Sequence, residues 1–144
     1  MNDDAVLTRR EGAVGVMTFN RPERLNTLDM PMMLVLEAAL GVLEADAQVR
    51  VIVITGADDR AFMAGGDIKD LSTRRPTSWY DEFGKTVHRV FRRFETCDKP
   101  TLAAVNGWAL GGGMDNAMSA ARSMGSCTRG SIKIAVVFIL LSAL

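Results

Sequence analysis

The sequence has few cysteines, no net charge and no apolar segment of membrane-spanning length. Cys97 and Cys127 are its only cysteines and lack the spacing of metal ligands, so we expect free thiols in a reducing compartment, the cytoplasm. The 17 basic residues are balanced by 17 acidic ones, which removes the electrostatic basis for a nucleic-acid partner. The longest apolar run, Ile134 to Leu144, is shorter than the roughly 20 residues that cross a bilayer. Met1 to Gly12 lacks the apolar core of a signal peptide, so we expect no membrane association.

What is present is the composition of one globular domain, with 144 residues of which 48% are hydrophobic and 24% charged. Alternating apolar residues around Glu11-Gly12 predict a hairpin of Val6 to Arg10 with Val14 to Phe19. Asp29 is a good N-cap for an amphipathic helix from Met30 to Asp46. The β-branched run Val51 to Thr55 is typical of a strand buried on both faces.

The second half continues the alternation of strands and helices. Ala61 to Lys69 is a strand-like piece that runs into glycines, and Ser72 to Thr77 is predicted to be a mobile polar loop. Ser78 caps a predicted helix from Trp79 to Thr96, and Pro100 precedes another apolar strand, Thr101 to Val105. This order predicts an α/β architecture built from repeated crossover units.

Two apolar strands are each followed by a glycine loop at a predicted helix start. The loops contain Gly65-Gly66 and Gly111 to Gly113. Glycine lets a ligand approach the backbone, and an oxyanion needs two converging donors. The Gly66 and Gly112 N–H groups are the candidate pair, whereas the alternative for each loop is a tight turn at the end of a strand. Neither the dinucleotide fingerprint nor a P-loop is present.

Three segments carry a resemblance to a known family. FNRPERLNTLD, AFMAGGDIKDL and KPTLAAVNGWALGGGMD, in this order, resemble the enoyl-CoA hydratase/isomerase family, the crotonase superfamily. The resemblance covers residues 6 to 121. It implies a crotonase-like spiral of ββα units, present here in truncated form. It also implies acyl-CoA thioesters as substrates, stabilised as enolates, with no metal and no cofactor, because coenzyme A is part of the substrate.

The resemblance assigns roles to individual positions. The two oxyanion-hole amides fall on Gly66 and Gly112. The Ala64 carbonyl falls where the family receives the adenine amino group, and Arg24 and Leu25 fall where it lines the CoA nucleotide. The residues expected to bind substrate are Arg24, Leu25, Ala64, Gly65, Asp67, Ile68 and Gly111. Asp67 is also expected to cap the helix after the first loop.

Asp115 falls where many hydratases of the family carry their first catalytic glutamate. A carboxylate there acts as general base toward water or the α-proton. The alternative is an acid that complements the dipole in the first turn of a helix.

Five further side chains lie in or near the motifs. Trp108, Phe62 and Met63 are expected to pack near the acyl pocket, with a plain core position as the alternative for Trp108. Lys69 is either a ligand of a CoA phosphate or a solvated side chain, and His88 is expected at the surface.

The pattern changes after residue 121. Residues 1–121 resemble the N-terminal part of a crotonase-like domain, whereas residues 122–144 form an atypical tail. The tail is either the product of a shifted reading frame or a loop followed by one more buried strand or helix. Because no acidic residue follows Asp115, the family's second catalytic acid has no candidate. The segments that build the family's trimer or hexamer are also missing, which leaves the oligomeric state open.

The sequence therefore favours a 2-enoyl-CoA hydratase. Three alternatives remain: a non-catalytic fragment that binds acyl-CoA, an enoyl-CoA isomerase or another acyl-CoA dehydratase, and a product without function.

Overall fold

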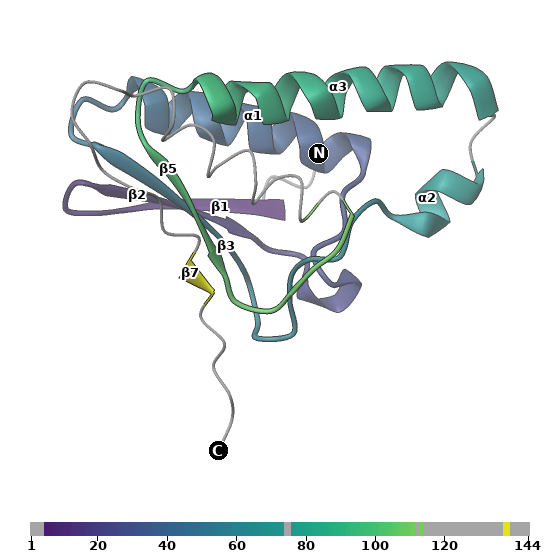
Figure 1. Ribbon diagram of the computed structural model, residues 1–144, viewed down its shortest axis with the longest axis horizontal. Helices are drawn as coiled ribbons and strands as arrows, with labels where there is room; N and C mark the ends of the chain where they lie inside the picture. The colour runs from purple at the N-terminus through teal and green to yellow at the C-terminus, as the bar shows by residue number, and fades with distance from the viewer. Residues whose placement is uncertain (1–4, 74–75, 112, 114–136, 139–144) are drawn as a thin grey trace.

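A five-stranded sheet with two long helices on one face is the main body of the structure (Figure 1). The computed structural model describes residues 5–73, 76–111, 113 and 137–138. The strand order is β1-β2-β3-β5-β7; the first pair is antiparallel and the others are parallel. The strands are β1 (Val6–Glu11), β2 (Val14–Phe19), β3 (Val51–Gly56), β5 (Thr101–Val105) and β7 (Val137–Phe138). The α/β class predicted from the sequence is confirmed.

The helices α1 (Met30–Ala45) and α3 (Pro76–Thr96) lie side by side over the sheet, and the short α2 (Ile68–Thr73) stands at one end (Figure 1). The predicted Asp29 cap is confirmed, since its Oδ1 accepts a hydrogen bond of 2.9 Å from the Met32 amide. Three further short elements are η2 (Pro22–Arg24), β4 (Ala61–Met63) and β6 (Trp108–Ala109).

The core lies between the sheet and the two long helices. Ile52 and Ile54 of β3 are fully buried, whereas Val51, Val53 and Thr55 are only half-buried. The expectation that β3 is buried on both faces was wrong, because α1 and α3 both cover the same face. The fully buried side chains include Met17, Phe19, Met32, Met33, Leu36, Leu40, Val90 and Phe94.

The predicted loop at residues 72–77 is largely helical. Ser72 and Thr73 end α2, and α3 begins at Pro76 rather than after a cap at Ser78. Proline is compatible with the first turn of a helix, because the amide it lacks has no partner there. Residues 74–75 lie outside the described residues.

The strand β7 falls within the tail at residues 122–144. It pairs in parallel with the end of β5, with Ala104 opposite Val137 and Val105 opposite Phe138. These two residues agree with the alternative of a loop followed by one more strand. The origin of the tail stays a prediction.

The two-stranded sheet of β4 and β6 brings the glycine loops together. The strands are parallel, with Ala61 opposite Trp108 and Met63 opposite Ala109. Parallel strands place their carboxyl ends on the same side, so the loops that follow them become neighbours. Gly65 and Gly111, which follow these two strands, accordingly lie close together.

Candidate functional site

The first glycine loop lies along the backbone of the RPERLNTLD segment. The Leu28 amide donates to the Gly65 carbonyl at 2.8 Å, and the Asp67 amide donates to the Leu28 carbonyl at 2.8 Å. In a parallel bridge of this kind the residue between the two bonded neighbours turns its own amide the other way. The Gly66 N–H is therefore directed away from Leu28 and is not consumed by this bridge.

Glycine is required where the two loops touch. Gly65 has a φ of +95°, and a β-carbon built there would stand 3.1 Å from the Leu110 carbonyl oxygen and 3.8 Å from the Gly111 Cα. Gly111 also has a positive φ, +49°. A side chain at Gly65 would strain the backbone and push the second loop away.

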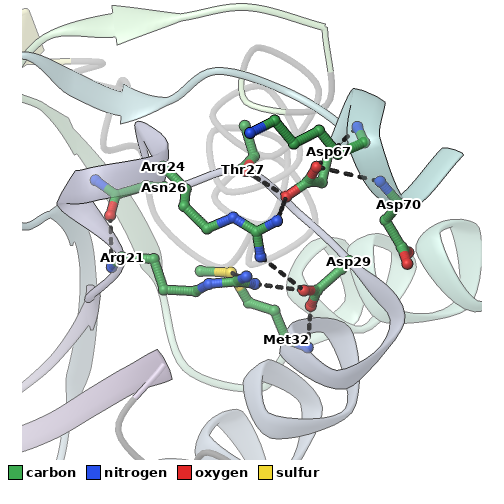
Figure 2. Close-up of polar contacts among 9 residues, drawn as sticks. Arg21, Arg24, Asn26, Thr27, Asp29, Met32, Asp67 and Asp70 are labelled. Atoms are coloured by element: carbon green, nitrogen blue, oxygen red, sulfur yellow. Dashed lines mark hydrogen bonds and ion pairs between the residues drawn. The ribbon is translucent and has the colours of Figure 1, made fainter. Parts of the chain in front are cut away.

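The carboxylate of Asp67 connects the first glycine loop with the start of α2 and with Arg24 (Figure 2). Its Oδ1 accepts hydrogen bonds from the amides of Lys69 at 3.0 Å and Asp70 at 3.3 Å. Its Oδ2 lies 2.7 Å from Nη2 of Arg24 and accepts a hydrogen bond of 3.4 Å from Thr27 Oγ1. The amide contacts are those of the helix cap expected for Asp67.

Asp67 stays ionised although it is buried. Burial raises its pKa, but the hydrogen bond from the Asp70 amide, the charge of Arg24 and the hydrogen bonds from Lys69 and Thr27 together lower the pKa below its usual value.

A second carboxylate, Asp29, lies on the other side of Arg24 (Figure 2). Its Oδ2 lies 2.6 Å from Arg21 Nη1 and 3.9 Å from Arg24 Nη1. The two arginines and two carboxylates thus form a chain in which Arg24 connects Asp29 with Asp67.

An open pocket of about 390 Å³ is formed where these elements meet. Six of the predicted site residues line it, and Lys69 does so as well. Gly65 is buried and does not line the pocket. Gly111 lies next to Gly65 and does not line the pocket either. The lining residues are Glu23, Arg24, Leu25, Thr27, Ala64, Gly66, Asp67, Ile68 and Lys69. Two of these lining residues are joined through their backbones, because the Ala64 amide donates a hydrogen bond of 3.1 Å to the Leu25 carbonyl.

Asn26 is a structural residue of the site that the sequence analysis missed. It is fully buried with a φ of +55°. Its Nδ2 donates to the carbonyls of Ala61 at 2.8 Å and Ala57 at 3.1 Å, and its Oδ1 accepts from the Arg21 amide at 2.9 Å. The available signal was its residue type, because asparagine tolerates the left-handed conformation better than most residues.

Trp108 is not where it was expected. Its side chain is 69% exposed, whereas Phe62 and Met63 are fully buried in the core. His88 is exposed, as predicted.

Gly112, Asp115 and Cys127 lie outside the described residues. Within the described ranges, no group of three or more His, Cys, Asp or Glu side chains is arranged to hold a metal ion. The helices described there are too short or too polar to span a bilayer.

Comparison with known proteins decides the family. The sequence model of enoyl-CoA hydratase/isomerase matches residues 9–122. The chain belongs to the enoyl-CoA hydratase/isomerase family. Among curated members it is 41% identical over 114 residues to the short-chain-enoyl-CoA hydratase of Clostridium acetobutylicum, covering 79% of this chain and 43% of that protein. It is 39% identical over 116 residues to the mitochondrial 3-hydroxyisobutyryl-CoA hydrolase of Bos taurus, covering 76% of this chain and 29% of that protein.

The family fold is confirmed by solved structures. The crystal structure of an enoyl-CoA hydratase/isomerase from Xanthobacter autotrophicus Py2 matches with a TM-score of 0.76 and 34% identity, covering 80% of this chain and 43% of that one. The chain thus spans less than half the length of these family members.

Proposed function

We propose that this chain carries the thioester-binding and enolate-stabilising part of an enoyl-CoA hydratase. The observation that supports the proposal most is the direction of the Gly66 amide. Leu28 bonds to both neighbours of Gly66, which leaves the Gly66 N–H turned toward the other side of the loop, in the wall of an open pocket. A backbone amide in this position can donate to the carbonyl oxygen of a bound thioester.

The pocket also suits the nucleotide end of coenzyme A. Leu25 is 40% exposed and Ile68 is 78% exposed, so both offer apolar surface to an aromatic ring. Ala64, whose carbonyl is the proposed acceptor for the adenine amino group, lines the same pocket. Coenzyme A enters as part of the substrate, so the proposal requires no separate cofactor.

The proposed reaction adds water across the double bond of a 2-enoyl-CoA. Hydrogen bonds from Gly66 and, as the second proposed donor, Gly112 draw electrons toward the thioester oxygen and make the β-carbon electrophilic. Asp115, in the proposed role of general base, removes a proton as the water oxygen bonds to the β-carbon. The resulting enolate takes up a proton from solvent at the α-carbon, which gives the 3-hydroxyacyl-CoA.

A second candidate is binding without turnover. The 29 residues that follow Asp115 here contain no Asp or Glu, so the proposal names no second acid that delivers the α-proton. Similarity to both a hydratase and a hydrolase supports the thioester chemistry that the two have in common more strongly than either complete reaction.

The test uses the purified full chain with crotonyl-CoA. Hydration predicts loss of the enoyl-thioester absorbance without release of a thiol, whereas hydrolysis predicts thiol release, detected with a disulfide reagent. Calorimetric binding without either change would support the second candidate. Absence of both binding and turnover would contradict the proposed function. Gly66→Pro removes the amide donor and is expected to abolish the reaction, with Gly66→Ala, which keeps the N–H, as the matched variant.

A further inference from the structure

Arg24 lies in the pocket wall, but its guanidinium is directed at carboxylates of its own chain. Nη2 lies 2.7 Å from Asp67 Oδ2 and Nη1 lies 3.9 Å from Asp29 Oδ2. The Asp67 side chain is only 6% exposed, while that of Arg24 is 40% exposed. A buried carboxylate is costly without a partner, so Asp67 depends on this arginine.

The charges around Arg24 also argue against a phosphate at this position. Asp67 and Asp29 lie beside the Arg24 guanidinium, and a phosphate would have to displace one of these two carboxylates. Lys69 lines the same pocket, is exposed and makes no ion pair with any residue in the described ranges. A phosphate in this pocket would therefore pair more favourably with Lys69 than with Arg24, which is already paired with carboxylates.

Asp67 follows Gly66 directly, and its contacts hold the backbone on the C-terminal side of Gly66. Its own amide is bonded to the Leu28 carbonyl at 2.8 Å, and its carboxylate binds the amides of Lys69 and Asp70. These contacts fix Asp67 on both sides of its Cα. The Gly66 N–H belongs to the Gly65–Gly66 peptide, whose carbonyl accepts from the Leu28 amide. Because the Asp67 amide is bonded to the Leu28 carbonyl, a displacement of Asp67 would disturb the bridge that sets the direction of the Gly66 N–H.

We propose that Arg24 and Asp67 are a positioning pair, in which Arg24 holds Asp67 so that the Gly66 N–H faces the substrate carbonyl. This inference rests on the proposed function and extends it, since it assigns Arg24 to the oxyanion end of the site rather than to a CoA phosphate. Arg24 and Asp67 touch no reacting atom in this role and act through Gly66.

The test compares Arg24→Gln with Lys69→Gln, which removes a positive charge from the same pocket. The probes are acetoacetyl-CoA and acetoacetyl-pantetheine, because a 3-oxoacyl thioester ionises to an enolate with its own ultraviolet absorbance and pantetheine lacks the nucleotide phosphates. For Arg24→Gln we expect the bound enolate signal to fall about tenfold or more with both probes, since a displaced donor costs that much. For Lys69→Gln we expect weaker binding of the CoA thioester only. Loss confined to the CoA thioester in Arg24→Gln would overturn the proposal.

A second readout needs no ligand and separates failure of this inference from failure of the proposed function. Amide hydrogen exchange at Lys69 and Asp70 is expected to be about tenfold faster in Arg24→Gln and in Asp67→Asn, because their acceptor is displaced or weakened. Exchange in β3 reports whether each variant remains folded and is expected to be unchanged. If the unsubstituted chain binds neither thioester, the proposed function fails. If amide exchange at Lys69 and Asp70 is unchanged in folded Arg24→Gln, the proposal that Arg24 positions Asp67 is overturned.

Discussion

Gly113 stands against the carbonyl group of Met63, and a β-carbon built on Gly113 would lie 2.0 Å from that oxygen. The same carbonyl accepts a hydrogen bond of 3.0 Å from the Leu110 amide. The second glycine loop is therefore docked on the end of β4, directly before the first loop. This contact sets the distance between the two loops, on which a pair of oxyanion donors depends.

Gly113→Ala is expected to destabilise the chain by about 2–4 kcal/mol, because a contact of this length with a backbone atom forces one loop to move. Gly84→Ala is the matched control. A β-carbon at Gly84 in α3 would meet nothing within 4 Å, so we expect a neutral effect or a gain of up to about 1 kcal/mol from helix propensity. Urea unfolding of the two variants measures the difference. Equal stabilities would contradict the docking of the second loop.

Asn26→Ala is expected to cost about 3–5 kcal/mol of folding free energy, because it leaves two carbonyls and one amide without their buried partner. Gln48→Ala, at an exposed position, is expected to stay within about 0.5 kcal/mol. Denaturant midpoints of both variants provide the measurement. A cost for Asn26→Ala as small as that for Gln48→Ala would show that these three hydrogen bonds are not needed for folding.

The stabilising effect of Asp67 is expected to depend on pH. Because the folded pKa lies below the usual value, the contribution is fully present above the unfolded value of about 3.9 and is lost as the pH falls through the lower folded pKa. Asp67→Asn should therefore cost about 1–3 kcal/mol near neutral pH, the range for hydrogen bonds to charged groups. The difference from the unsubstituted chain should shrink below about pH 4. Urea unfolding of both proteins across this range tests the sign, and a difference independent of pH would contradict it.

Cys97 is expected to be unreactive in the folded chain. Burial, the largest cause, together with Glu44 and Asp98 raises its pKa to about 11 against a lowering hydrogen bond from the Lys99 backbone. At pH 8 only about one thiol in a thousand is then the reactive thiolate. Iodoacetamide should label the Cys97 peptide slowly in buffer and rapidly in urea, with mass spectrometry as the readout. Equally rapid labelling in both would mean that Cys97 is accessible and ionised in the folded protein.

Much of the fold was predictable because it is encoded locally. The hairpin of β1 and β2, the helix α1 and its cap at Asp29 involve residues close in sequence, and the structure confirms each of them. The wrong predictions concern burial, which depends on the segments that pack on a strand from elsewhere in the sequence. The half-buried face of β3 is the one that α1 and α3 do not cover, and Trp108 is exposed although Phe62 and Met63 of the same small sheet are buried. The polar segment before α3 was misjudged because its proline was taken for a loop residue rather than a first-turn residue.

The candidate site also has a part that local sequence predicts and a part that depends on tertiary contacts. The sequence identified Gly66 and most of the pocket lining from the glycine loops and from resemblance to the family. It missed Asn26, whose partners are far away in the sequence. Gly112 and Asp115 remain predictions.

The sequence by itself determined the class of fold, the family and the residue types available for chemistry, because periodicity, turn chemistry and motif order are properties of neighbouring residues. Only the tertiary structure decided what those residues do to one another. Folding places Leu28 beside both neighbours of Gly66 and thereby directs the Gly66 amide away from Leu28. It also places the Asp67 carboxylate against Arg24, because a buried charge requires a partner that no local pattern specifies.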